Sequence, residues 1–367
     1  GHTRWATHGE PNDVNAHPHV SQSGKLAVVH NGIIENYLEI KQSLLHKGVV
    51  FASDTDTEVI VQLLEYYYKK SSNLMDAVYE VLNRIKGAYA MGTLCSDFPE
   101  QLIAVRKDAP LLIGYGADGN YIASDVTALL AHTRTVTYME DDEVAVVTAD
   151  HVQILGRDGC FLEKEKHQIQ WDVSAAEKGG YAHFMLKEIM EQPEAVRRTI
   201  QPRLADGEIV FEELEDERYL MKGISRIYLV ACGSAYHVGM IGKYALERLL
   251  GIPVEACLAS EFRYSGPLLG ESALVIVISQ SGETLDSMAA LREAKRRGSK
   301  VLSIVNVMGS SIARESDHVL YTWAGPEIAV ATTKAYTTQT VLLLMLGVYL
   351  ARRLDRIGSC LLYTSPS

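Results

Sequence analysis

The sequence lacks long hydrophobic runs and an excess of positive charge, and each absence argues against a class of protein. The longest apolar stretch, Val341 to Ala351, falls well short of the roughly 20 apolar residues of a membrane-spanning helix, so we expect a buried helix there. The formal net charge of −11 over 367 residues argues against a nucleic acid as partner. A small phosphate held by backbone N–H groups stays compatible with this charge. We therefore expect contact with neither a membrane nor a nucleic acid.

Cysteines are few and show no pairing pattern. There are five of them, an odd number without a C-x-x-C spacing: Cys95, Cys160, Cys232, Cys257 and Cys360. This usage is typical of a reducing cytoplasm rather than of a disulfide framework, and the opening Gly1-His2-Thr3-Arg4 shows no signal-peptide pattern. The absent initiator Met and the loss of helical period after Ile357 indicate a fragment with a non-native tail over 358–367. An ordinary frayed C-terminus is the alternative.

Internal repeats and low-complexity segments are also absent, and the pattern changes once along the chain. Up to about residue 166 it is rich in strands, with amphipathic helices over 58–70 and 74–84. The predicted strands are 26–30, 88–94, 102–105, 121–123, 144–147 and 152–155. From Ile224 onwards strands alternate with helices, which predicts a parallel sheet. We predict an α+β domain over 1–168, a linker over 169–200 and an α/β domain over 201–357.

The clearest chemical signal is a polar turn after an apolar strand. Leu274 to Ile278 predicts a buried strand, and Ser279 to Thr284 (Ser-Gln-Ser-Gly-Glu-Thr) leads into a helical pattern. A helix N-terminus with free N–H groups suits a phosphate, and Ser279, Ser281 and Thr284 add hydroxyl groups. The alternative is a tight strand–helix turn with a helix cap.

A second turn of the same kind favours the phosphate hypothesis. The apolar run Ile227 to Ala231 is followed by Cys232-Gly233-Ser234-Ala235 and a helical pattern from Tyr236 to Leu250. Two such turns on one sheet can face one ligand, because α/β sheets bind ligands beyond the carboxyl ends of their strands. Neither turn is a Walker P-loop or a G-x-G-x-x-G fingerprint, so the sequence favours a sugar phosphate over a nucleotide and suggests no cofactor.

These turns, with Ser260 to Tyr264 and Val330 to Ala335, resemble the sugar isomerase (SIS) family. More narrowly, they are similar to the first SIS domain of the isomerising glutamine–fructose-6-phosphate aminotransferases. The resemblance implies that the Ser-Gln-Ser-Gly-Glu-Thr turn holds the sugar phosphate. The implied sugar-phosphate residues are Gly233, Ser234, Ser279, Gln280, Ser281, Thr284 and Val330. Ala235 stands where the family often has a hydroxyl residue, so one phosphate contact is expected to be absent.

The N-terminal segment His2 to Gly9 concentrates polar and aromatic residues. Arg4 is suited to clamp a carboxylate with two hydrogen bonds, the alternative being a surface loop. His8, His17 and His19 raise the question of a metal, but no Cys or acidic residue has the required spacing, so we predict no metal site. The acidic run Glu140 to Glu143 is interpreted as a solvated turn rather than a calcium site.

Two further segments carry possible chemistry. Val28 to His30 predicts a strand that ends in Asn31-Gly32. The Asn side chain and the Gly N–H can form an oxyanion hole for acyl transfer, whereas Asn-Gly is also a common hairpin turn. Asp56 opens a helix, where it either binds an amino group or caps the helix.

Together these segments resemble the class II glutamine amidotransferase family, whose fold is an αββα sandwich with an N-terminal nucleophile. The resemblance implies that Arg4 and Asp56 bind glutamine, that Asn31 and Gly32 form the oxyanion hole, and that three residues belong to the loop closing over glutamine: Trp5, Thr7 and His8. The family's nucleophile is an N-terminal Cys, and Gly1 is not that residue. The family's second SIS domain, with its Schiff-base Lys, is not recognisable either.

The resemblance implies an enzyme that transfers the glutamine amide nitrogen to fructose 6-phosphate and forms glucosamine 6-phosphate. We expect the fragment itself to be inactive, the intact parent to be a homodimer, and glutamine and fructose 6-phosphate to be its substrates. A related SIS-domain deglycase or a sugar-phosphate-binding regulator is the alternative. The predicted glutamine-binding residues argue against a regulator, which needs no glutamine site.

Overall fold

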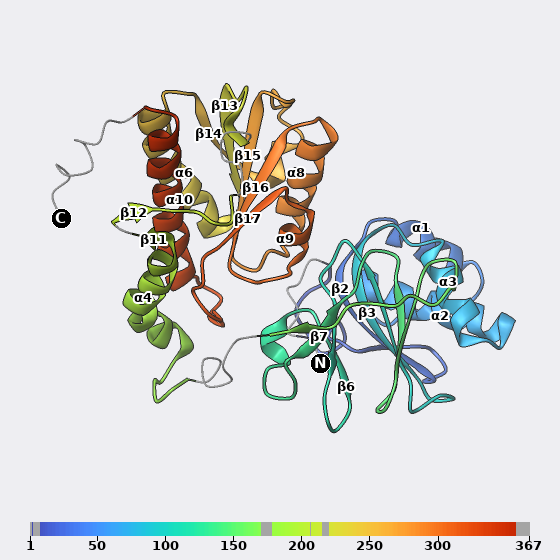
Figure 1. The fold of residues 1–367 in the computed structure, drawn as a ribbon. Helices are drawn as coiled ribbons and strands as arrows, with labels where there is room; N and C mark the ends of the chain where they lie inside the picture. Colours follow the sequence, from blue (N-terminus) through green and yellow to red (C-terminus); the bar gives the residue numbers. More distant parts are fainter. Residues whose placement is uncertain (1, 3–7, 170–177, 206, 215–219, 357–367) are drawn as a thin grey trace. The chain divides into compact units, whose positions relative to one another are not determined.

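The computed structural model describes residues 2, 8–169, 178–205, 207–214 and 220–356. Contacts divide the chain into two compact units, Gly1–Gln170 and Trp171–Ser367. The first runs from blue to green in Figure 1 and the second from yellow-green to red. Each unit has hydrophobic cores of its own.

Two antiparallel sheets form the centre of the first unit. The larger sheet has the strand order β1-β2-β3-β4-β8-β9. Its strands are β1 His19–Val20, β2 Leu26–Ile34, β3 Gly87–Cys95, β4 Leu102–Lys107, β8 Val144–Val147 and β9 Val152–Leu155. The smaller sheet has the order β10-β7-β5-β6, with β10 His167–Gln168, β7 Thr135–Tyr138, β5 Leu112–Tyr115 and β6 Asn120–Ala123.

The larger sheet is covered on both faces, because successive side chains of a strand point to opposite sides. On one face Ile103 joins a core with the helices α1 (Tyr37–Leu45), α2 (Asp56–Ser71) and α3 (Leu74–Leu82). On the other face the neighbouring Ala104 packs with Ile113 of the smaller sheet. The layers are therefore helices, sheet and sheet.

The second helical layer of the predicted αββα sandwich is small. A Cβ atom at Gly114 of β5 would meet side-chain atoms of Leu129 and Thr133, which follow the 3-10 turn η1 (Val126–Ala128). Within the part of this unit that the structure describes, that turn is the helical element on the outer side of β5.

The second unit is built on a five-stranded parallel sheet of order β14-β13-β15-β16-β17, as the alternating pattern predicts. The strands are β13 Arg226–Ala231, β14 Val254–Leu258, β15 Ala273–Ser279, β16 Lys300–Val305 and β17 His318–Tyr321. The helices are α4 Phe184–Ile200, α6 Gly233–Leu250, α7 Ala259–Phe262, α8 Leu285–Arg296, α9 Ser311–Glu315 and α10 Lys334–Arg353. A short hairpin of β11 Leu204–Ala205 and β12 Glu208–Ile209 follows α4.

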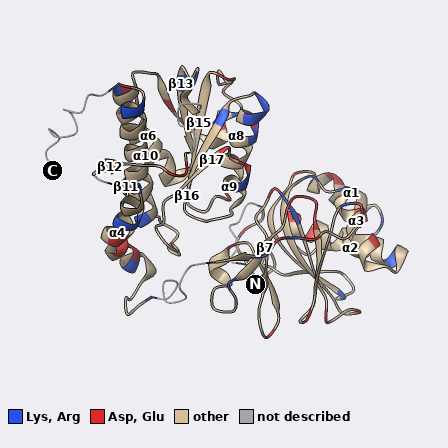
Figure 2. Cartoon of the chain, in the orientation of Figure 1, with Lys and Arg blue, Asp and Glu red and all other residues tan. Residues whose placement is uncertain are grey.

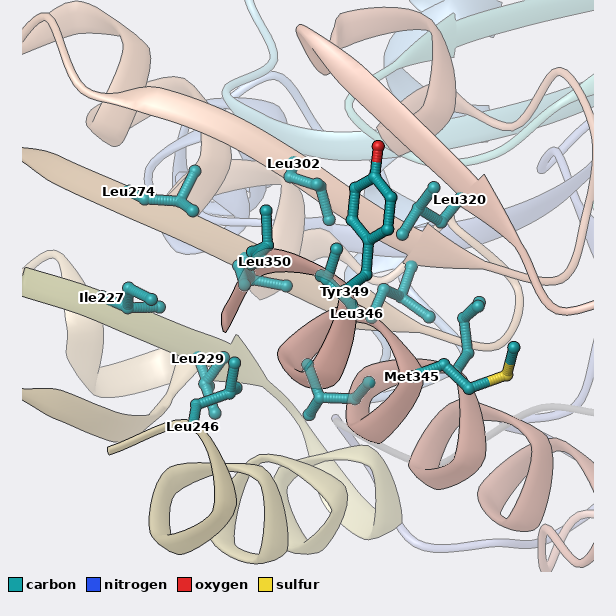
Figure 3. Close-up of a cluster of buried hydrophobic side chains, with 14 of the residues drawn as sticks. Ile227, Leu229, Leu246, Leu274, Leu302, Leu320, Met345, Leu346, Tyr349 and Leu350 are labelled. Atoms are coloured by element: carbon teal, nitrogen blue, oxygen red, sulfur yellow. The ribbon is translucent and has the colours of Figure 1, made fainter. Parts of the chain in front are cut away.

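Helices cover both faces of this sheet. Figure 3 shows strand residues such as Leu229 and Leu302 packed against Leu246 of α6 and Leu346 and Tyr349 of α10. The opposite face packs on α7, α8 and α9. The predicted buried helix over Val341 to Ala351 is confirmed as part of α10. Among the described residues no helix combines the length and the hydropathy needed to cross a membrane.

The charges of α8 and α10 follow their helix dipoles. Lys295 and Arg296 stand in the last turn of α8, and Arg352 and Arg353 in the last turn of α10, where Figure 2 shows blue ribbon. Cations are favourable at helix C-termini. These four basic side chains therefore stand at the helix ends where the dipole favours them.

Candidate functional site

The two predicted polar turns lie on neighbouring strands. Ala231 of β13 pairs with Ile278 of β15 in parallel register, so the turns that follow leave the sheet at the same edge. Cys232 Sγ of the first turn lies 3.9 Å from Ser287 Oγ of α8. The structure thus brings together the two segments that the sequence suggested for one ligand.

Hydrogen bonds inside the turn 279–284 fix its shape. Gly282 N donates to Ser279 Oγ at 3.0 Å, and Glu283 N donates to Ser281 Oγ at 3.2 Å. Ser279 Oγ also lies 3.3 Å from Thr284 Oγ1. Ser279, which is buried, therefore serves the turn itself, while Ser281 and Thr284 stay partly exposed.

The alternative of a side-chain helix cap does not describe this turn. Thr284 occupies the N-cap position of α8 but makes no side-chain hydrogen bond to the helix. Cys232 occupies the same position before α6, also without a side-chain cap. The first N–H groups of both helices are therefore not capped by these side chains.

Gly282 is required by the fold of the turn. Its φ of +68° is a left-handed conformation, and a Cβ atom there would lie 2.0 Å from Ser310 Oγ. The start of α9 holds the turn from the same side, since Ile312 N donates to Gly282 O at 3.0 Å and Ser311 N donates to Glu283 Oε1 at 2.8 Å. The turn is therefore fixed by tertiary contacts, in addition to its own hydrogen bonds.

The first turn is more open. Gly233 begins α6 with a φ of +55°, and Gly233 and Ser234 are exposed at the edge of the sheet. Ala235, where the family often has a hydroxyl, instead packs against the core. Burial raises the pKa of the Cys232 thiol, so this thiol stays protonated at neutral pH.

A third segment reaches this edge: residues 322–333, which we call the β17–α10 loop. Asn306 follows β16 and joins the loop to the turn, since Asn306 Nδ2 donates to Gly325 O at 2.8 Å and Asn306 N donates to Gln280 O at 3.2 Å. Val330 lies further along the loop and is 97% exposed. The sequence contained a signal for the missed residue Asn306, because it is a polar residue directly after an apolar strand, like the other two turns.

In the first unit, Asn31 and Gly32 lie inside strand β2. The predicted strand end at His30 and the hairpin alternative are both wrong, because β2 continues to Ile34 and pairs with β3 throughout. Gly32 has a φ of +137°, and a Cβ atom there would lie 2.0 Å from Ala88 O. Only glycine fits this distorted point of the strand. Without a side chain at position 32, the Asn31–Gly32 peptide lies close against β3.

Asp56 lies beside this point of β2. It is buried, and its Oδ2 accepts a hydrogen bond from Ile34 N at 2.8 Å. The helix-cap alternative for Asp56 is wrong, because Thr55 is the N-cap residue and its side chain accepts from Glu58 N. The structure therefore brings together Asn31, Gly32 and Asp56, which are 25 residues apart at most in the sequence.

Buried polar groups support the start of α2. Burial acts to raise the pKa of Glu58, but hydrogen bonds from Ala52 and Ser53 outweigh it and hold that pKa below its usual range. His30 Nδ1 lies 3.0 Å from Thr57 Oγ1. Burial lowers the pKa of His30 to about 4, although the nearby Asp56 acts to raise it, so this imidazole is neutral at neutral pH.

The remaining N-terminal residues are only partly described. His8 packs edge-on against Tyr37, with ring centroids 4.8 Å apart. The predicted glutamine-binding residues Arg4, Trp5 and Thr7 lie outside the described residues. His19 Nε2 lies 3.1 Å from Thr55 Oγ1. Among the described residues, no group of three or more His, Cys, Asp or Glu could hold a metal ion.

Comparisons with known proteins match both units. Residues 2–131 match the family model of the glutamine amidotransferase domain, and residues 220–349 match that of the SIS domain. The glutamine–fructose-6-phosphate aminotransferase (isomerizing) of Caldanaerobacter subterraneus subsp. tengcongensis is 53% identical over 98% of this chain and 59% of its own length. The enzyme of that name from Clostridium acetobutylicum is 52% identical over 96% of this chain and 58% of its own length. The chain thus spans less than two thirds of these relatives.

A solved structure is similar to part of the chain. It is described as the C-terminal domain of glucosamine-fructose-6-phosphate aminotransferase from Francisella tularensis. It is 41% identical, covers 51% of this chain and 53% of its own, and has a TM-score of 0.49.

Proposed function

We propose that the whole protein transfers the glutamine amide nitrogen to fructose 6-phosphate. The chain matches a glutamine amidotransferase domain in its first unit and a SIS domain in its second. The products are glucosamine 6-phosphate and glutamate. The main support for this proposal is that one chain contains two separate candidate sites, one for glutamine and one for a sugar phosphate. Asn31, Gly32 and Asp56 form the first site, and the turns after β13 and β15 form the second.

In the glutamine site, Asp56 binds the α-ammonium group and Asn31 and Gly32 stabilise the oxyanion. The hydrogen bond from Ile34 N orients the Asp56 carboxylate through Oδ2, which leaves Oδ1 to face the substrate. Oxyanion stabilisation needs donors that are fixed before the reaction. The close approach of β3 to Gly32 supports this role, because it restricts movement of the Asn31–Gly32 peptide. Arg4 binds the substrate carboxylate, and Trp5, Thr7 and His8 close over it.

In the sugar site, neutral groups hold the phosphate. The segments Cys232-Gly233-Ser234-Ala235 and Ser279–Thr284 contain no Lys or Arg, so backbone N–H groups at the starts of α6 and α8 and the hydroxyls of Ser281 and Thr284 supply the hydrogen bonds. Ser279 shapes the turn through Gly282 N. Gly233, Ser234, Gln280 and Val330 complete the proposed set.

The organisation of the protein follows from the same proposal. Residues 1–168 form the amidotransferase domain, 169–200 the connection and 201–357 the SIS domain, and the whole protein is a homodimer. The cytoplasm is its proposed location. The four cysteines among the described residues are free thiols, which supports a reducing compartment.

The decisive experiment supplies the whole protein with glutamine and fructose 6-phosphate and follows glucosamine 6-phosphate and glutamate by mass spectrometry. We expect both products in equal amounts. Binding of the sugar phosphate without either product would support a regulator instead. Cleavage of a phosphorylated amino sugar without use of glutamine would support a deglycase.

A further inference from the structure

Helix α4 presents a polar stripe to the rest of its unit. The helix continues through Pro193, whose missing N–H leaves the Ile189 carbonyl without its usual helical donor. Gln192 Nε2 donates to this carbonyl at 3.1 Å. Glu188, Gln192, Ala195 and Thr199 recur at helical spacing and so share one face. The face is buried at Glu188, Ala195 and Thr199, which directs it to the protein interior.

Glu188 holds the backbone of the β17–α10 loop. Its Oε1 accepts hydrogen bonds from Ile328 N at 2.6 Å and from Ala329 N at 3.1 Å. The side chain is 2% exposed, and its Oε2 has no hydrogen-bond partner among the described residues. Burying a carboxylate is costly unless it is hydrogen-bonded, and hydrogen bonds to a charged acceptor are short and strong. The position of these two amides is therefore determined by Glu188.

The next turn of α4 holds the start of α10. Glu191 Oε2 lies 2.6 Å from Lys334 Nζ, and Thr337 Oγ1 donates to Gln192 Oε1 at 2.6 Å. Lys334 is 2% exposed. Helix α4 therefore contacts the middle of the β17–α10 loop at Ile328 and Ala329, and it also contacts the start of α10, where the loop ends.

The other end of the loop is tied to the sugar-phosphate turn. Asn306 bonds Gly325 on one side and Gln280 on the other, and Ala324 N donates to Asn306 Oδ1 at 2.9 Å. The loop thus runs from a point beside the turn 279–284 to the residues that Glu188 holds. Val330 follows directly after Ala329, and its exposed side chain has no packing of its own that would fix its place.

We propose that Glu188 is a positioning residue for the sugar-phosphate site. It fixes Ile328 and Ala329 so that Val330 stands at the carboxyl edge of the sheet, beside the turn that contains Gln280. This role rests on the proposed function of that turn. Glu188 touches neither phosphate nor sugar, and it acts through the backbone of the loop.

The test is a calorimetric titration of fructose 6-phosphate into the wild type and three variants. Glu188→Ala removes the acceptor, and we expect affinity to fall at least ten-fold. Glu188→Gln keeps one acceptor oxygen for both amides, so it should restore most of the affinity. Glu194→Gln is the matched control on the exposed side of α4, where Glu194 pairs with Arg197 at 3.0 Å, and it should bind like the wild type.

Hydrogen exchange of the peptide 325–333 gives a second measurement on the same samples. Exchange should accelerate in Glu188→Ala and stay slow in Glu188→Gln. If Glu188→Ala does not fold, Glu188→Asp replaces it, because its shorter side chain reaches both amides poorly, and at least three-fold weaker binding is expected.

The outcomes separate the two proposals. Wild-type affinity in Glu188→Ala, or in the Asp variant that replaces it, overturns the role of Glu188 and leaves the sugar-phosphate site standing. A wild type that does not bind fructose 6-phosphate overturns the site and the role of Glu188 together.

Discussion

Asp56 and Ile34 are joined by a hydrogen bond of 2.8 Å between the Asp56 carboxylate and the Ile34 N–H. This bond fixes the first residue of α2 to β2 just beyond the distorted Gly32. Asp56, the proposed ligand of the amino group, thereby gains a fixed spacing from Asn31 and Gly32, the proposed oxyanion hole.

Replacing Asp56 by Asn should separate its structural role from its role in binding. The Asn side-chain oxygen can still accept from Ile34 N, so the fold should be kept. The lost charge removes a hydrogen bond between charged groups, worth about 1.5–3 kcal/mol. At about 1.4 kcal/mol per ten-fold change, kcat/KM for glutamine should fall roughly ten- to hundred-fold. Glutaminase kinetics of the whole protein measure this.

Asp54→Asn is the control for this change, because Asp54 is exposed two residues earlier. Its kinetics should match the wild type. An Asp56→Asn variant with unchanged kcat/KM would remove Asp56 from the glutamine site.

Gly32→Ala should destabilise the first unit strongly. The added Cβ atom would lie 2.0 Å from Ala88 O at a φ of +137°, and overpacking costs about 1–3 kcal/mol in addition to about 1–3 kcal/mol of backbone strain. Gly24→Ala is the matched control, because Gly24 also has a positive φ but nothing within 4 Å of the new atom. Urea unfolding should place Gly32→Ala about 1–3 kcal/mol below the control, because the control shares the backbone strain but lacks the overpacking. Equal stability of the two variants would mean that β2 and β3 can move apart to accommodate the new atom without lowering the free energy of unfolding.

His30 should make the stability of the first unit depend on pH. Its pKa falls from the usual 6.5 to about 4 in the folded state, so the unfolded chain binds more protons between these values. The stabilising effect is therefore present above pH 6.5 and is lost as the pH falls towards 4. At 1.36 kcal/mol per pKa unit, the loss amounts to about 3 kcal/mol.

The measurement is urea unfolding from pH 7 to pH 4 for the wild type and for His30→Gln, which cannot titrate. The variant should lose less stability over this range. Parallel curves for the two proteins would show that His30 does not control the acid sensitivity.

The parallel sheet could be predicted from the sequence because its strands are apolar runs bounded by Gly and Ser, which have few alternatives to a buried strand. Strands β5 and β7 and helix α1 were not predicted. They are four to nine residues long, and patterns this short do not separate helix from strand.

The surroundings of the predicted site residues could likewise not be predicted from the local sequence. Asn31–Gly32 was expected at a strand end, because the sequence does not reveal that β3 continues the pairing to Ile34. Glu188 carries no local signal, since the amides that it holds are 140 and 141 residues away. Contacts of that range are set by tertiary packing.

Ser281→Ala distinguishes a phosphate ligand from a residue that only stabilises the turn. A hydroxyl hydrogen bond to a charged phosphate is worth about 1.5–3 kcal/mol, so affinity for fructose 6-phosphate should fall about ten-fold or more. If Ser281 only orders the turn through Glu283 N, the variant should melt at a lower temperature and bind unchanged. Ser225→Ala is the control, because Ser225 is exposed just before β13, at the opposite edge of the sheet. Calorimetric titration with melting followed in parallel decides between these outcomes, and equal affinity of Ser281→Ala and Ser225→Ala would remove Ser281 from the phosphate site.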